Sequence, residues 1–374
     1  MNSKERMKAA MNLKPVDKIP VMCQMSIGHM LIQTGFPPCE FWFDKDIFAS
    51  GLIKLREIYN FDGILVSLHG HSPNWRDSII KIEKIDDGEL AELINGDKIV
   101  FPFNDLPHYL YKNKIDKPSL SDITESSLPE ILDYIPVSAN LYFHIDQQNK
   151  FNILEDLVKS HGNEFSIHGE ITSPLDYFLD MLGYEPALMA LLDDPDKCKM
   201  ILKHFAKLVK QLAVEMCDTG IDAIKVSSPF AGMGFLSPDN YEEFVLPFER
   251  EIIEAVREKG VHIYIHTCGS IGDRLELMFE TGMSGIECLD PEPLGNVKLE
   301  DAVERIADKG FIKGNIDSVN TLLMGTREKI IEDAKHRLAI GKTHAGFILS
   351  TACSIAPAVK RENIQLLKEI ADKF

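Results

Sequence analysis

Residues 261–270 read VHIYIHTCGS, an apolar run that ends in a histidine and a cysteine one residue apart and is followed by glycine. β-Branched and aromatic residues favour a buried strand. Side chains two residues apart on a strand point to the same face. The pattern therefore predicts a buried strand whose carboxyl end presents His266 and Cys268 together.

Seven more short apolar runs occur along the chain, and long amphipathic stretches separate many of them. The strands expected, in chain order, are 19–24, 63–68, 165–171, 223–228, 262–268, 285–290, 311–316 and 347–353. Strand–helix alternation indicates parallel strands joined by helical crossovers. Eight such units predict an α/β fold, a (β/α)8 TIM barrel, with an open doubly wound sheet as the alternative.

Residues 70–150 do not follow this alternation. They contain KIEKIDDGELAELINGDKIVFPFND, in which DDGE and NGD are turn signals between β-rich runs. We expect a small antiparallel β-hairpin inserted after the second barrel strand, and then a polar connection. The chain is accordingly predicted to be a single barrel domain over residues 1–374, with the insertion at 70–150 inside it.

Composition excludes several classes of protein. The chain has 374 residues, 45% of them hydrophobic and 26% charged, and a formal charge of −18, which is unfavourable for binding nucleic acid. We find no uncharged apolar stretch of about 18 residues and no secretory signal at the start, so no membrane span is expected. The seven cysteines are odd in number and dispersed, which favours a reduced, cytoplasmic location over a disulfide framework.

A third soft donor lies near the end of the chain. Residues 346–357 read GFILSTACSIAP, another apolar run that ends in a cysteine, Cys353. Carboxyl ends of barrel strands converge on one mouth, so Cys353 can meet His266 and Cys268 there. One imidazole, two thiolates and an open fourth position describe a catalytic zinc site. The alternative is that the cysteines are apolar filler and the histidine is structural.

Other polar residues at strand ends are weaker candidates. Glu287 is expected as the fourth metal ligand, with Asp290 as a substitute, although Glu287 could instead orient a ligand by hydrogen bonding. Cys288 should pack against helices, because it alternates with Glu287. His69 and His71 form a second pair, for which a surface loop is favoured over a metal site.

Six residues are expected to bind substrate, with the alternative that they only satisfy the loops at the strand ends. They are Gln24, His29, His168, Glu170, Asn315 and Asp317.

Over almost its whole length the chain resembles the uroporphyrinogen decarboxylase superfamily. The stretches that carry the resemblance are SPLDYFLDMLGYEPALMALLDDPDK, AIKVSSPFAGMGFLSPDNYEEFVLPFEREI, HTCGSI, KGNIDSVNTLLMGTREKI and GFILSTACSIAPAVKRENIQLLKEI. The resemblance implies a (β/α)8 barrel with its site at the carboxyl ends of the strands.

Two departures distinguish this chain from the decarboxylases themselves. The decarboxylases carry Arg-Gln-Ala-Gly-Arg after the first strand and an essential aspartate in Phe-Ser-Asp-Ile at the second. Residues 25–29 here read MSIGH and residues 66–69 read VSLH, so both arginines and the aspartate are missing. Anionic tetrapyrroles need basic partners, and a decarboxylase reading is therefore the weaker alternative.

The other branch of the superfamily contains corrinoid-dependent methyltransferases similar to methylcobamide:coenzyme M methyltransferases. These carry a His-x-Cys and a distant Cys as zinc ligands, which His266, Cys268 and Cys353 match. The resemblance implies transfer of a methyl group between a corrinoid (cobalamin) and a thiol, tetrahydrofolate, or a methoxylated or methylated compound.

The corrinoid is expected on a separate protein, because this chain has no Asp-x-His-x-x-Gly motif. A non-catalytic member that binds a corrinoid protein is a further alternative. Monomer and homodimer both remain open.

Overall fold

The computed structural model describes residues 1–113, 116–138, 140–306 and 308–374. Within these ranges the central sheet has seven strands, each parallel to its neighbours. In spatial order they are β1 (Gly63–Val66), β8 (Ser166–Thr172), β9 (Ala223–Ser227), β10 (His262–Thr267), β11 (Gly285–Cys288), β12 (Phe311–Ile316) and β13 (Phe347–Thr351). The predicted parallel α/β fold is confirmed.

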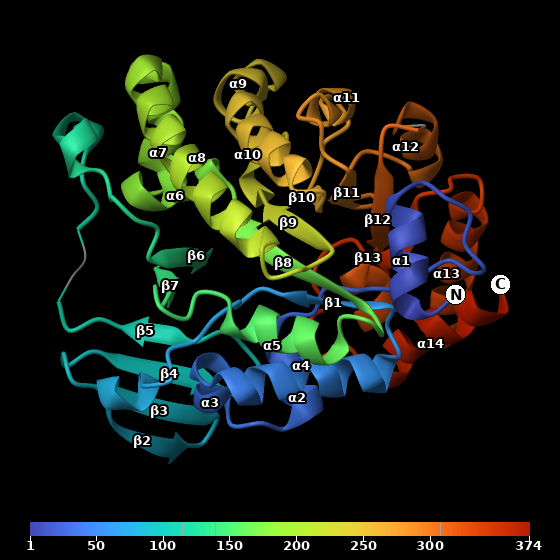
Figure 1. Cartoon of the computed structure of the whole chain (residues 1–374), viewed down its shortest axis with the longest axis horizontal. Coiled ribbons are helices and arrows are strands. Elements are labelled where there is room, and N and C mark those ends of the chain that lie inside the picture. Colours follow the sequence, from blue (N-terminus) through green and yellow to red (C-terminus); the bar gives the residue numbers. More distant parts are fainter. Residues whose placement is uncertain (114–115, 139, 307) are drawn as a thin grey trace.

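Helices follow one another around the outside of this sheet (Figure 1). The apolar faces of most of them form one large buried core with the strands. The amino-terminal helix instead packs into a second, smaller cluster with strand residues such as Tyr264 and Phe311. The helices are α1 (Ser3–Met11), α2 (Ile27–Thr34), α3 (Pro38–Phe43), α4 (Lys45–Tyr59), α5 (Asn152–His161), α6 (Pro174–Leu182), α7 (Tyr184–Asp193), α8 (Pro195–Cys217), α9 (Pro238–Phe244), α10 (Leu246–Glu258), α11 (Leu275–Phe279), α12 (Leu299–Ile306), α13 (Arg327–Gly341) and α14 (Arg361–Lys373). In the described parts of the chain, none of them combines the length and apolar composition needed to cross a bilayer.

The strand expected at 19–24 is not regular. The segment makes only isolated parallel bridges, Val21 with Leu349 and Met25 with Ile355. Met22 N donates to Leu349 O (3.0 Å) and Asp62 N donates to Val21 O (2.8 Å), so the segment lies between β13 and the start of β1. The Val21 amide donates to the Asp62 carboxylate (2.9 Å) rather than to a strand carbonyl, and Pro20 has no amide hydrogen to give. The described residues therefore form seven regular parallel strands where eight were predicted.

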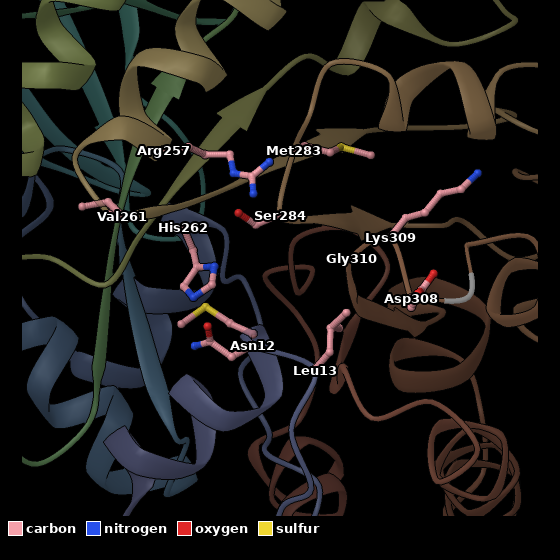
Figure 2. Close-up of a pocket in the computed structure, with 12 residues that line it drawn as sticks. Asn12, Leu13, Arg257, Val261, His262, Met283, Ser284, Asp308, Lys309 and Gly310 are labelled. Carbon is pink, nitrogen blue, oxygen red and sulfur yellow. The ribbon is translucent and has the colours of Figure 1, made fainter.

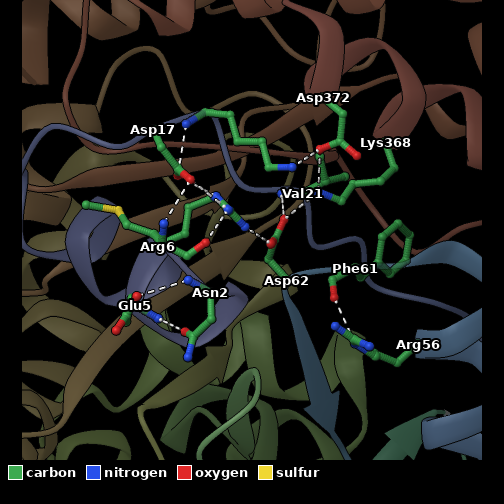
Figure 3. Close-up of polar contacts among 12 residues, drawn as sticks. Asn2, Glu5, Arg6, Asp17, Val21, Arg56, Phe61, Asp62, Lys368 and Asp372 are labelled. Atoms are coloured by element: carbon green, nitrogen blue, oxygen red, sulfur yellow. Dashed lines mark hydrogen bonds and ion pairs between the residues drawn. The ribbon is translucent and has the colours of Figure 1, made fainter.

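Asp62 also ties the ends of the chain to this segment (Figure 3). Its fully buried carboxylate accepts from Arg6 Nη1 of α1 (2.6 Å) and lies 3.4 Å from Lys368 Nζ of α14. Arg6 in turn donates to Asp17, and Lys368 to Asp372. One carboxylate thus joins the amino-terminal helix, the irregular segment, β1 and the last helix.

The insertion between β1 and β8 is larger than the single hairpin expected. It contains a four-stranded antiparallel sheet and a separate two-stranded one. The DDGE turn joins the first strand to the second, and the NGD turn joins the second to the third. The stretch 112–130, predicted as a polar connection, has no strand among its described residues, and the two-stranded sheet comes after it. The strands are β2 (Ile79–Ile85), β3 (Gly88–Leu93), β4 (Lys98–Pro102) and β5 (His108–Leu110) in the first sheet, and β6 (Tyr134–Ser138) and β7 (Leu141–His144) in the second.

Candidate metal centre

The structure brings His266, Cys268 and Cys353 together, although the two cysteines are 85 positions apart in sequence. His266 Nε2 lies 3.3 Å from Cys268 Sγ, and the two sulfur atoms are 3.9 Å apart. One donor atom from each residue lies within 4.8 Å of the others. His266 is buried near the end of β10, and the two thiols are half-buried in the loops that follow β10 and β13.

These distances fit a zinc ion. Tetrahedral geometry with Zn–S bonds of about 2.3 Å and Zn–N bonds of about 2.0 Å places two sulfurs about 3.8 Å apart and a sulfur and a nitrogen about 3.5 Å apart. The observed separations of 3.9 and 3.3 Å are close to both values. The donor set is therefore suited to a zinc ion that keeps a fourth position for another ligand.

Glu287 contacts the imidazole on the side away from the thiols. On the adjacent strand β11 it pairs in register with His266, and its Oε2 lies 2.9 Å from His266 Nδ1. The ring nitrogen that faces Glu287 is the donor, so Nε2 is left free for a metal. Glu287 is not part of the three-donor cluster; its position differs from that expected of a fourth ligand and fits the orienting alternative.

Two buried lysines keep Glu287 ionised. Lys313 Nζ of β12 contacts Oε1, and Lys225 Nζ of β9 lies 3.9 Å from Oε2. Burial by itself raises the pKa of Glu287, but the charges of Lys313 and Lys225 and the hydrogen bond from His266 outweigh it and hold that pKa well below its usual range. Neither lysine was predicted from the sequence. Their signal is a lysine within an otherwise apolar strand, AIKVS and FIKGNI.

Cys288 was expected to pack against helices, and the structure corrects this. Its Sγ, the Sγ of Cys268 and a carboxylate oxygen of Asp290 form a second cluster of possible metal donors, all within 4.8 Å of one another. Strand alternation fails here because Cys288 and Leu289 have φ values of 91° and 50°, which turn the backbone into the left-handed region. Asp290 Oδ2 accepts from Gly269 N (2.7 Å) and so fixes the loop that carries Cys268.

A cavity of about 340 Å³ is lined in part by Ser354, the residue that follows Cys353. Gln24 and Glu170, two of the six residues predicted to bind substrate, line it. Behind them Lys225 Nζ donates to Gln24 Oε1 (2.9 Å) and lies 2.7 Å from Glu170 Oε1. The buried lysine therefore connects the cavity wall to Glu287 and, through it, to His266.

The other four residues expected to bind substrate do not line this cavity, within the described chain. His29 Nε2 lies 2.7 Å from the Tyr59 hydroxyl, and burial lowers the pKa of His29. His168 lies between the hydroxyls of Ser166 and Tyr264, both at 3.0 Å, and burial lowers its pKa to about 3.

Asn315 and Asp317 are likewise engaged by the protein. Asn315 donates to Leu289 O and accepts from Arg337, while Asp317 accepts from the first amides of the π-helical turn Ser318–Leu323. His29, His168, Asn315 and Asp317 are thus hydrogen-bonded within the protein, as the alternative of a structural role at the strand ends predicts.

His69 and His71 are buried, and not on a surface loop as expected. His69 Nδ1 lies 2.5 Å from Lys150 O, and His71 Nε2 lies 2.9 Å from Trp42 O. Burial lowers the pKa of each to about 4, so both are neutral. They fasten the start of the insertion to its end and to α3.

A second cavity, of about 400 Å³, lies at the opposite end of the strands. Figure 2 shows it among Arg257 of α10, His262 at the start of β10, Ser284 before β11 and Lys309 before β12. Parallel strands with helical crossovers carry their active sites at the carboxyl ends. The cavity beside Cys353 is therefore the candidate site.

Comparison with known proteins places the chain in a family. The family model for Uroporphyrinogen decarboxylase (URO-D) matches residues 142–374, which hold the strands from β8 to β13 and all three donors. The chain belongs to the URO-D family. The predicted family is thereby confirmed.

Among URO-D family relatives, methylcobamide:CoM methyltransferases are prominent. MtbA of Methanosarcina acetivorans is 27% identical over 227 residues, 58% of this chain and 61% of that protein. MtaA of Methanosarcina barkeri is 24% identical over 99% of this chain and 98% of its own length. A uroporphyrinogen decarboxylase of Prochlorococcus marinus is also similar, 27% identical over 59% of this chain and 63% of that protein.

A solved structure supports the fold over the whole chain. A methyltransferase from Methanosarcina mazei superposes with a TM-score of 0.73 at 20% identity, covering 100% of this chain and 99% of that one. The fold shared with that structure therefore includes the part of the chain before residue 142, which the family model does not match.

Proposed function

We propose that this URO-D family protein is a zinc-dependent methyltransferase that moves a methyl group between a corrinoid on a separate protein and a small substrate. The main support for the proposal is that His266 Nε2, Cys268 Sγ and Cys353 Sγ lie close together, at separations suited to zinc. The similarity to methylcobamide:CoM methyltransferases supports the same chemistry.

The chain's own residues have distinct parts in this mechanism. His266, Cys268 and Cys353 would hold the ion, and two thiolates with a neutral imidazole would balance its charge. Bound zinc would keep a substrate thiol ionised, or polarise an ether or alcohol oxygen. Glu287 holds the His266 ring by its Nδ1, and Lys225 and Lys313 keep that carboxylate charged. The substrate is accordingly a thiol, tetrahydrofolate, or a methoxylated or methylated compound.

We further infer that residues 20–25 take the place of the first strand in a (β/α)8 barrel that forms one domain over residues 1–374. Hydrogen bonds from this segment to Leu349 of β13 and from Asp62 beside β1 support the inference. A corrinoid protein would then dock over the mouth at the carboxyl ends.

A decarboxylase is the second candidate, because the family contains such enzymes. Against it, Met25, which lines the cavity, and His29 occupy the positions where the decarboxylases carry their two arginines. Release of carbon dioxide from uroporphyrinogen would favour it. Binding of a corrinoid protein without turnover would favour a non-catalytic member.

Metal content and methyl transfer test the proposal together. Wild-type protein should hold about one zinc per chain and transfer methyl between cobalamin and a small substrate. The Cys353→Ala variant should lose both properties, whereas Cys198→Ala, which removes a buried thiol of α8, should keep both. Full methyl transfer by zinc-free wild-type protein would overturn the proposal.

A further inference from the structure

The cavity beside Cys353 has polar and apolar walls but no basic one. The described residues that line it include no lysine, arginine or histidine. Its polar side chains include the amide of Gln24 and the carboxyl groups of Asp105 and Glu170; the others are hydroxyls, those of Ser26, Ser67, Thr172, Ser227 and Ser354. Trp42, Leu68 and Ile135 give it apolar surface.

A buried cation behind the cavity wall is already engaged. Lys225 is 1% exposed, and its ammonium contacts Glu170 and Gln24, which line the cavity. The charge of Lys225 is further compensated by the Glu287 carboxylate, 3.9 Å away. A bound anion would therefore find no uncompensated positive side chain there.

Asp105 leaves the cavity with an excess of negative charge. It lies in the exposed segment after β4, and its Oδ1 accepts from the backbone amide of Leu106. Within the described ranges it forms no ion pair. Glu170 is compensated by Lys225, whereas Asp105 is not, and the chain as a whole carries a formal charge of −18.

We propose that the substrate group held in this cavity is neutral or positively charged, such as a hydroxyl or ammonium, and that sulfonates, carboxylates and phosphates are rejected. An anion would lose hydration without gaining a cationic partner. The inference rests on the proposed function, because it takes the cavity to be the substrate's place beside the metal. The insertion, which supplies Asp105 and Ile135, would thereby set specificity.

Three thiols of equal length test this charge preference. They are 2-aminoethanethiol, 2-mercaptoethanol and 2-mercaptoethanesulfonate, which differ only in the terminal group. Each is titrated into protein whose zinc has been replaced by cobalt(II), and growth of the thiolate-to-cobalt band gives its Kd. We expect the sulfonate to bind about tenfold or more weakly than the other two, about 1.4 kcal/mol.

Variants separate the contribution of the cavity from the intrinsic affinity of each thiol for the metal. When the Kd of one thiol is compared between two variants, its intrinsic affinity for the metal cancels. Asp105→Asn should weaken 2-aminoethanethiol about two- to fivefold and strengthen or leave unchanged the sulfonate. Asp86→Asn, which removes an exposed charge from the β2–β3 turn, should change the Kd of none of the three thiols.

Tightest binding of the sulfonate to wild-type protein, or no effect of Asp105→Asn on the ammonium thiol, would overturn the inference alone. Failure to form any thiolate-to-cobalt band with the protein's own cysteines would overturn the proposed function and this inference with it.

Discussion

At the scale of single residues, the chemistry depends on a chain of buried charges behind the three donors. Lys313 and Lys225 hold Glu287, and Glu287 holds His266. A carboxylate that accepts a hydrogen bond from the N–H of an imidazole fixes both the tautomer and the orientation of that ring. The metal's affinity should thus depend on a residue that does not touch the metal.

Replacing Glu287 by glutamine tests this. The amide keeps the size of the side chain but removes the charge that orients the imidazole. Zinc affinity should fall about 10- to 100-fold, measured by competition with a chromophoric chelator, with circular dichroism to show that the variant is folded. Glu164→Gln, an exposed substitution, should leave affinity unchanged, and an unchanged affinity in Glu287→Gln would contradict the orienting role.

At the scale of secondary-structure elements, Asp62 decides how the irregular segment 20–25 joins β1 and β13. Its buried carboxylate serves Arg6, Lys368 and the Val21 amide together. Removing one partner of a buried ion pair costs about 3–5 kcal/mol, because the other charges stay buried.

Asp62→Asn should therefore lower the free energy of unfolding by about 3–5 kcal/mol, measured by urea denaturation. Asp218→Asn breaks an exposed ion pair with Lys259 and should cost less than about 1 kcal/mol. Equal losses in the two variants would show that Asp62 does not join these elements.

Two buried carboxyl groups on α6 and α10 give the fold a pH dependence. Burial raises the pKa of Asp176 to about 8 and that of Glu249 to about 7. Neither carboxylate oxygen of Glu249 has a hydrogen-bond partner among the described residues. Both groups are therefore protonated in the folded protein under mildly acidic conditions, whereas the unfolded chain ionises them near pH 4.

This difference in protonation between the folded and unfolded states determines whether stability rises or falls with pH. The contribution of these two groups to stability should fall as pH rises from about 4, where the unfolded state loses the protons, to about 8, where the folded state has lost them too. Glu249 alone should account for roughly 3 kcal/mol. The buried neutral His69, His71 and His168 act in the opposite direction, so the effect is measured as a difference between variants. In urea unfolding at pH 5, 6, 7 and 8, wild type should lose stability relative to Glu249→Gln as pH rises. Glu254→Gln, exposed on the same helix, should follow wild type, and parallel curves for all three proteins would refute the assignment.

At the scale of the whole molecule, the proposed ion would join the loop after β10, the central strand of the seven, to the loop after β13, the strand at one edge. A ligand that binds only the folded state stabilises it, by about 2.7 kcal/mol at a free concentration 100 times its Kd. Metal removal should therefore loosen the fold as a whole.

Adding a strong chelator to zinc-loaded protein should lower the Tm by several degrees, as scanning calorimetry would show. Cys353→Ala should melt near the chelated value and should not respond to chelator. A wild-type Tm that ignores zinc and chelator alike would count against a metal bridge between these loops.

Local patterns predicted much of the fold. Seven of the expected strand positions, such as 262–268 and 347–353, overlap observed strands, because apolar runs between amphipathic stretches are a local signal. Residue types at strand ends were also enough to select His266, Cys268 and Cys353, since parallel strands converge at their carboxyl ends.

The sequence by itself determined the parallel α/β class, the family and the three soft donors, because these depend on residue types and their spacing along the chain. Only the tertiary structure decided that Glu287 faces Nδ1 of His266, that Lys225 and Lys313 balance it, and that His29 and His168 are engaged away from the cavity. It also decided that Asp62 takes the Val21 amide and so interrupts the first strand. Each of these outcomes depends on which group, distant in sequence, forms a hydrogen bond or ion pair with a buried polar atom. The spacing of residues along the chain does not specify these long-range contacts.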